Sequence, residues 1–312
     1  MKRIIALIVT GLLVLVLLTG LSAVPASARG TDDWSVGDAR IAEEVTSLVI
    51  ESPDIDVFLK TGSGQEILIT ESSGAELSDD QKVRWQLDGT TLRIKYGDSI
   101  IQGIFGFLLG NNNRSLTVTL PEDLVLDSLN VSVASADVTT DTLCAASADF
   151  SASSGDMTLS LNGEMENAAF SSSSGNITAS LETAEAVRAD ASSGDLFVTL
   201  QTAGQFAAGT SSGEITLKAG EITDLSIKSA SGEVYAGLAK APEDASISTA
   251  SGDVTAALPE DADLTITVNT ASGDFTSQLP VVMDGKTYAL GSGSGQMSIS
   301  TASGDISIRK AD

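Results

Sequence analysis

The sequence has no histidine, one cysteine and few aromatic residues, which make up 4% of its 312 positions. The lack of histidine excludes Ser-His-Asp and Cys-His nucleophiles, histidine-ligated zinc and imidazole acid–base catalysis. With Cys144 alone, no intramolecular disulfide can form. Because the most prominent aromatic residues cluster before the repeats described below, no aromatic platform recurs along the chain.

Basic residues are also scarce. Lys and Arg number 17 against 42 Asp and Glu, which gives a formal net charge of −25. Residues 1–28 hold two basic and no acidic residues, so their removal leaves −27. Such a surface repels nucleic acid and anionic lipid headgroups, and we expect neither as a partner. It would attract divalent cations or basic partners.

Residues 1–28 have the layout of a secretory signal peptide: Lys2-Arg3, an apolar run, then Ala26-Ser27-Ala28 as a cleavage site. The apolar run is long, so an uncleaved membrane anchor formed by residues 4–24 is the alternative. In both cases we expect the rest of the chain to be extracellular or in the cell envelope. Residues 29–46 are polar and are predicted to be a leader.

From residue 127 onward, a phrase of small residue, Ser, Gly, acid or amide, and apolar residue returns nine times. Its glycines are spaced 20, 19, 19, 19, 20, 21, 22 and 9 residues apart. They are Gly155, Gly175, Gly194, Gly213, Gly232, Gly252, Gly273, Gly295 and Gly304. Apolar and polar residues alternate on both sides of each glycine, which indicates half-buried strands. Each period is therefore predicted to be strand, Ser-Gly turn, strand and looser turn, with glycine chosen because it accepts positive φ.

A period of 19–20 residues predicts a stack of repeats. An antiparallel meander would leave an apolar face with no helix to cover it, whereas a closed barrel would hide that face. In a single-stranded β-solenoid, the two strands of each rung lie on opposite sides of a flattened coil and cover each other. We therefore predict an all-β fold in which residues 127–312 form solenoid rungs and residues 47–126 form an N-terminal capping region.

The ends of the repeat array are irregular. Pro53 and Ala136 stand where other rungs have glycine, so Ala136 is expected to have a different turn. Gly273 and Gly304 are 31 residues apart, which corresponds to one period plus an insertion and places Gly295 at the opposite edge. Arg309-Lys310 is expected to blunt the last edge strand.

The most apolar part of the mature chain is Ser99–Gly110. It is predicted to cap the open end of the solenoid, and the alternative is a contact with a membrane or partner. The residues that would make either contact share one face at helical spacing. They are Ile100, Ile101, Ile104, Phe105 and Leu108.

The residue after each turn glycine is usually acidic and would form a column along the solenoid, with members about 4.8 Å apart. The functional interpretation is a row of weak Ca²⁺ sites, since that ion takes hard oxygen ligands. The candidate residues are Asp156, Asp195, Glu214, Glu233, Asp253 and Asp274. We favour the simpler interpretation, that acids suit an exposed turn, because one ligand per rung makes no cage. No other cofactor and no catalytic residue is expected.

A β-helix polysaccharide lyase or glycosidase is the enzymatic alternative, with carboxylates of adjacent rungs as acid and base. Every rung offers the same acid, however, so nothing singles out a pair, and catalysis is not expected. A self-associating structural surface repeat is a further alternative.

The repeated Ser-Gly-acid-apolar phrase, the export signal, Ser52-Pro53-Asp54-Ile55 and the Leu116–Pro121 strand resemble a bacterial family of cell-envelope proteins. This is the putative-adhesin family DUF4097, and the resemblance covers about residues 41–310. It implies a β-strand-repeat fold and a non-catalytic, adhesin-like role with an unknown surface or envelope ligand. It transfers no catalytic or ligand residue.

Overall fold

The computed structural model describes residues 34–96 and 114–311. Within these ranges the chain forms 23 β-strands joined in one hydrogen-bonded array, with no helix among them. The predicted segments 1–28 and 99–110 lie outside the described residues. No helix of the described part is long and apolar enough to cross a membrane.

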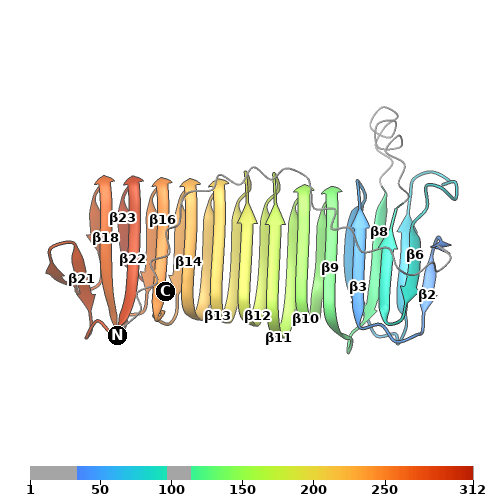
Figure 1. Cartoon of the computed structure of the whole chain (residues 1–312), viewed down its shortest axis with the longest axis horizontal. Helices are drawn as coiled ribbons and strands as arrows, with labels where there is room; N and C mark the ends of the chain where they lie inside the picture. The colour runs from blue at the N-terminus through green and yellow to red at the C-terminus, as the bar shows by residue number, and fades with distance from the viewer. Residues whose placement is uncertain (1–33, 97–113, 312) are drawn as a thin grey trace, which may run out of the picture. The chain divides into compact units, whose positions relative to one another are not determined.

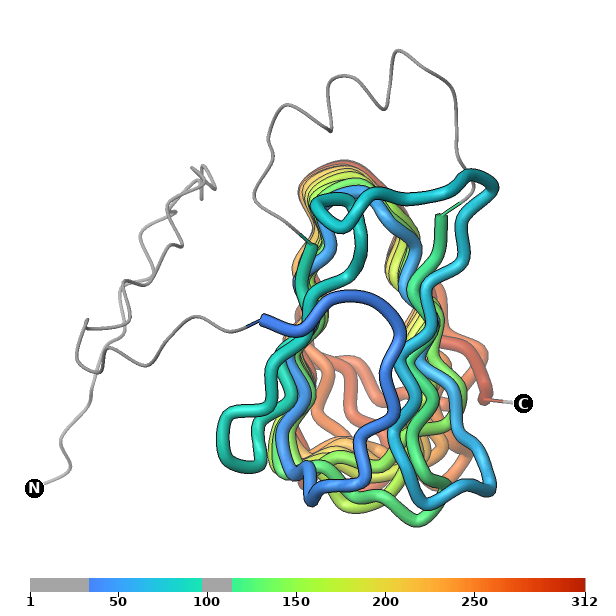
Figure 2. Tube along the Cα trace, turned by 90° about the vertical axis from the view of Figure 1, so that its right-hand side faces the viewer, coloured from blue at the N-terminus to red at the C-terminus, as the bar shows by residue number. Residues whose placement is uncertain are grey.

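Each sequence period forms one coil of a β-solenoid, which confirms the predicted fold. Five long strands each run from one Ser-Gly corner, around the looser corner, to the next Ser-Gly corner. They are β10 (Val138–Ser154), β11 (Met157–Ser172), β12 (Ile177–Ala191), β13 (Leu196–Ser212) and β14 (Ile215–Ser231). Neighbouring strands pair in parallel with equivalent residues in register, as where Leu196 lies opposite Ile215. Figure 2 looks along the stack and shows the coils superimposed.

The core lies between the two sides of the coil. We call the strand that leads into a Ser-Gly corner the incoming side and the strand that leaves it the outgoing side. Alternate residues of both sides point inward, and Phe150, Phe170 and Phe206 are among the largest fully buried side chains. Since each inward residue stacks on its equivalents in neighbouring coils, the core is continuous along the array.

Close stacking explains the glycine at the Ser-Gly corner better than φ does. A Cβ on Gly175 would lie 1.8 Å from the carbonyl oxygen of Gly155, and one on Gly194 would lie 2.0 Å from that of Gly175. Of the corner glycines, only Gly155, Gly273 and Gly304 have positive φ. The prediction that positive φ selects glycine is therefore wrong for most corners.

Ala136 opens the glycine column and is unstrained. No residue other than glycine has positive φ in the described ranges, and Ala136 is buried. Its corner continues the pattern of the later ones, because the Asp137 N–H reaches the coil before it at 3.1 Å. The expectation of a different turn at this corner is wrong, since the Asp137 carbonyl accepts the Val57 N–H just as the Asp156 carbonyl accepts the Val138 N–H at the next corner.

The N-terminal end contains two coils that the chain lays down out of spatial order. Strands β3 (Ser47–Ser52) and β4 (Asp56–Gly62) pair in parallel with β9 (Val125–Ser135) and β10. Strands β7 (Thr91–Lys95) and β8 (Ser115–Pro121) add the next coil outward. The chain between β7 and β8, which includes the apolar segment 99–110, takes the sequence position that the Ser-Gly corner has in other coils.

Antiparallel strands cover the outer edge of this coil. β6 (Arg84–Asp88) pairs with β7, and β5 (Ile67–Ser72) pairs with β8. β1 (Ser35–Val36) and β2 (Ala39–Ile41) then pair with β6 and β5. Glu71 stabilises this end, because its buried carboxylate lies 2.6 Å from the Arg114 guanidinium and accepts the Val83 N–H.

At the C-terminal end, the last coil in sequence is not the last in space (Figure 1). The coil of β16 (Asp244–Ser251) and β17 (Val254–Leu258) pairs with that of β22 (Gly295–Ser303) and β23 (Ile306–Lys310). The coil of β18 (Leu264–Ser272) and β19 (Phe275–Ser277) lies beyond it. The β18–β19 coil therefore lies one coil position beyond β16 and β17, and β22 and β23 later occupy the position between them.

The hairpin of β20 (Val282–Asp284) and β21 (Thr287–Leu290) pairs antiparallel with β18 and covers the far edge. Gly295 begins β22 at the corner opposite Gly304, as predicted. The prediction that Arg309-Lys310 blunts the last edge strand is wrong, because β23 lies between β17 and β19. The remaining strand, β15 (Val234–Leu238), lies between β14 and β17.

Candidate functional site

The acids that follow the corner glycines form a hydrogen-bonded column, which we call the acid ladder. In each step, a side-chain oxygen of one coil accepts the backbone N–H of the equivalent residue in the next coil. The Asp156 Oδ1 accepts the Asn176 N–H at 2.8 Å, and the Asp195 Oδ1 accepts the Glu214 N–H at 2.8 Å. These N–H groups sit at a sharp corner where no strand partner is available, so the ladder satisfies them.

The acid ladder runs through most of the stack and follows its spatial order. It begins at Asp56 and Asp137 and continues without a break to Glu214. At the far end, Asp305 donates its N–H to Asp253, and Asp274 donates its N–H to Asp305, both at 2.8 Å. This second run crosses the coil of β22 and β23.

The ladder is interrupted where glutamate replaces aspartate. Within the described ranges, the side chains of Glu214 and Glu233 accept no N–H from the following coil. Glu214 instead accepts the Thr216 hydroxyl at 2.9 Å. A glutamate carries one more methylene than an aspartate, so its carboxylate overshoots the neighbouring N–H.

The predicted Ca²⁺ candidates therefore share a column, but four of the six have another role. Asp156, Asp195 and Asp253 each use a side-chain oxygen to hold an N–H, and Glu214 uses its carboxylate to accept the Thr216 hydroxyl. In the part of the chain that the structure describes, no group of three or more His, Cys, Asp or Glu side chains could hold a metal ion. The candidates for membrane or partner contact, Ile100 to Leu108, lie outside the described residues.

A second column runs along the outgoing side, three residues after each corner glycine and its equivalents. Eight of its eleven members are hydroxyl residues, and the other three are aromatic. In spatial order they are Thr117, Phe58, Thr139, Thr158, Thr178, Phe197, Thr216, Tyr235, Thr255, Ser307 and Thr276. We call this column the threonine lane.

Sequence reasoning missed the aromatic members of the threonine lane. Phe197 is 37% exposed, which is unusual for so large an apolar side chain. The Tyr235 ring lies over Gly237, since a Cβ there would come within 3.0 Å of the ring. The signal was present in the sequence as a departure from threonine at a fixed distance from the glycine.

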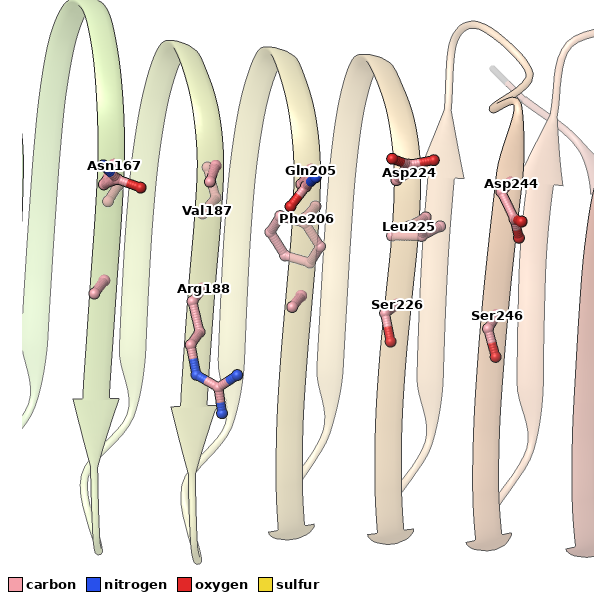
Figure 3. A pocket seen from close by; sticks show the side chains of 14 residues that line it. Asn167, Val187, Arg188, Gln205, Phe206, Asp224, Leu225, Ser226, Asp244 and Ser246 are labelled. Atoms are coloured by element: carbon pink, nitrogen blue, oxygen red, sulfur yellow. The ribbon is translucent and has the colours of Figure 1, made fainter. Parts of the chain in front are cut away.

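The incoming side carries a shallow depression that crosses five coils, with a volume of about 670 Å³ (Figure 3). Outward alanines, Ala169, Ala186 and Ala207, leave space over the backbone. Polar side chains line the depression along one row, at the end nearer the looser corner. They are Asn167, Gln205, Asp224 and Asp244. Within the described ranges these four side chains have no hydrogen-bond partner, so they are available to a ligand.

Arg188 is the one basic residue in the depression. Its Nε lies 2.6 Å from the Asp190 carboxylate. Burial raises the pKa of Asp190, and the Arg188 guanidinium partly opposes that rise. The pair lies on the surface, with Arg188 68% exposed, so it orients the guanidinium without adding much stability.

Three comparisons relate this chain to known proteins. The Toastrack DUF4097 family matches residues 45–309. Among solved structures, the putative adhesin BF0245 from Bacteroides fragilis is 12% identical, with a TM-score of 0.41, and covers 89% of this chain and 98% of its own. A putative lipid binding protein from Parabacteroides distasonis is 14% identical, with a TM-score of 0.44 over 89% of this chain and 98% of its own. No curated protein matches the chain.

Proposed function

The chain belongs to the Toastrack DUF4097 family, and from this premise we propose that it is a non-catalytic protein of the cell envelope with an adhesin-like binding role. Its solenoid would present long, regular faces to a ligand at the cell surface. The export layout of residues 1–28 and the charge of −25 support this location.

One observation carries the proposal. The ladder acids, which the β-helix enzyme alternative would use as acid and base, hydrogen-bond neighbouring coils, whereas polar side chains on the flat sides are unpartnered within the described ranges. Acid–base catalysis by two carboxylates needs environments that differ between them. The ladder gives each aspartate the same environment and the same hydrogen bond. The row Asn167, Gln205, Asp224 and Asp244 offers polar contacts that the fold does not use.

The experiment has two parts. Intact cells that make the full chain are treated with protease, and the N-terminal residue of the native protein is determined. We expect surface exposure, with Arg29 at the N-terminus after cleavage or Met1 or Lys2 if the anchor is kept. The purified protein is then screened for polysaccharide depolymerisation and is expected to be inactive. Activity that is lost on alanine substitution of adjacent ladder acids, or a cytoplasmic protein, would overturn the proposal.

A further inference from the structure

Equivalent residues of neighbouring coils have nearly the same surroundings, so the residue at each position can be compared with its equivalents in the other coils. A residue that recurs shows what the fold requires there. Threonine or serine fills eight of the eleven places in the threonine lane, so the fold does not need an aromatic residue in the lane. An exposed ring there has no structural reason, and large exposed apolar groups often mark binding sites.

Five departures from the repeat meet on three consecutive coils of the outgoing side. Phe197 and Tyr235 replace threonine in the lane. Glu214 and Glu233 replace aspartate in the ladder beside it. On the other flank of the lane, Lys218 occupies the position that Thr199 has in the preceding coil. We call these five residues the aromatic patch, and its strands β13, β14 and β15 are adjacent in the stack.

The two rings are set for a ligand that runs across the strands. Phe197 and Tyr235 lie two coils apart with Thr216 between them, a separation of about 9.6 Å at the usual strand spacing. Gly237 lets the Tyr235 ring lie against the strand, because any Cβ there would meet the ring. The backbone positions of the two aromatic residues lie in one line with a hydroxyl residue between them, and their separation matches the length of a disaccharide.

The flanks of the aromatic patch supply polar contacts. The Glu214 carboxylate holds the Thr216 hydroxyl at 2.9 Å, and Glu233 has no partner within the described ranges. Lys218 is exposed and is likewise unpaired in that part of the chain. Carboxylates accept hydrogen bonds from hydroxyl groups, while aromatic faces take the C–H groups of a sugar ring.

We propose that the aromatic patch binds a neutral glycan chain that lies across β13, β14 and β15. This inference rests on the proposed adhesin-like function and names its ligand class. The two glutamates leave the patch with a net negative charge despite Lys218, and the whole chain carries −25, which disfavours acidic polysaccharides and anionic membranes. A purely apolar partner would leave both glutamate carboxylates desolvated and unpaired.

Binding of the full exported protein to neutral polysaccharides tests the proposal. A soluble β-glucan, a mannan and chitin oligosaccharides serve as probes in calorimetry and affinity electrophoresis, with hyaluronate as the anionic control. The key variants are Phe197→Thr and Tyr235→Thr, which restore the residue found in neighbouring coils and should keep the fold. We expect each to weaken binding about tenfold or more, as for an aromatic anchor that the bound ligand covers.

Two further variants sharpen the test. Gly237→Ala keeps both rings but displaces Tyr235, and it should also weaken binding. Gln205→Ala lies in the depression on the incoming side, and it should leave glycan binding unchanged. A wild-type protein that binds none of the neutral probes, or binding that survives Phe197→Thr together with Tyr235→Thr, would overturn the proposal.

Three other results would also count against the proposal. Preference for hyaluronate, for phosphatidylcholine vesicles or for a second copy of the chain in light scattering would overturn the assignment to neutral glycans. The proposed function is judged separately, by surface exposure and lack of depolymerising activity. A protein that is exposed on the cell surface but binds none of the neutral glycans would thus refute this inference and leave the proposed function standing.

Discussion

Completing the acid ladder should stabilise the protein. The ladder stops because Glu214 and Glu233 overshoot the next N–H, whereas each aspartate reaches its own at 2.8–3.1 Å. The double substitution Glu214→Asp with Glu233→Asp keeps the net charge and adds two hydrogen bonds to backbone N–H groups, at the loss of the exposed bond between Glu214 and the Thr216 hydroxyl. An intramolecular hydrogen bond contributes about 0.5–1.5 kcal/mol, and the exposed corner favours the lower half of that range.

Repulsion between stacked carboxylates opposes this gain. Two charges about 4.8 Å apart in water repel by about 0.9 kcal/mol before screening. The glutamates already carry the same charge, so the substitution adds only a fraction of that energy. We therefore expect a net gain of about 0.5–1.5 kcal/mol, which corresponds to a Tm rise of about 1–3 °C for a chain of this size.

Thermal unfolding followed by circular dichroism measures the effect at low and high salt. The gain should be larger at high salt, because screening weakens repulsion more than it weakens the hydrogen bonds. Glu185→Asp makes the same chemical change on an exposed site outside the ladder and should leave Tm unchanged. A double variant whose Tm stays at or below the wild-type value at every salt concentration would refute the ladder as a stabilising element.

Three further perturbations follow from the structure. Gly194→Ala places a Cβ 2.0 Å from a backbone oxygen, so it should cost about 3 kcal/mol or more in urea unfolding, whereas Gly64→Ala, with open space around it, should cost little. Hydrogen bonds from Ser292 and Ser294 lower the pKa of Asp263 to about 2 from 3.8, so its stabilisation is complete above about pH 4 and is lost as the pH falls toward 2. Asp263→Asn should remove that acid-dependent part of a Tm-against-pH curve, and an unchanged curve would contradict this. Glu71→Gln leaves a mostly buried arginine without its anion and should cost about 2 kcal/mol by the same urea assay, against about 0.5 kcal/mol or less for the exposed Glu66→Gln.

The sequence predicted the structure of each coil well, because short-range features of the chain determine that structure. Alternation with period two and a corner every 19 or 20 residues leave few ways to bury both strand faces, and the solenoid prediction was confirmed. The position of the glycine was predicted correctly, but the reason was wrong. Backbone φ is a property of one residue, whereas the lack of room for a Cβ on Gly175, which would lie 1.8 Å from the Gly155 carbonyl oxygen, arises only when coils stack.

The order of the end coils could not be read from the chain. Residues 264–277 and 295–310 carry the same corner phrase, so either could pair with β17 on local pattern alone. The choice depends on connection lengths and on the edge that the β20–β21 hairpin covers. The aromatic patch was missed for another reason, because Phe197 and Tyr235 look unremarkable until the register shows that threonine occupies the equivalent places.

The coil of β22 and β23 changes how the protein can come apart. β23 pairs in parallel with β17 on one side and with β19 on the other, so it is an interior strand although it follows both of them in sequence. A force that pulls on β23 must break its pairing with β17 and its pairing with β19, because neither side of the strand is a free edge. During synthesis β22 and β23 follow β16 to β19, so they must insert between two coils whose strands have already been made.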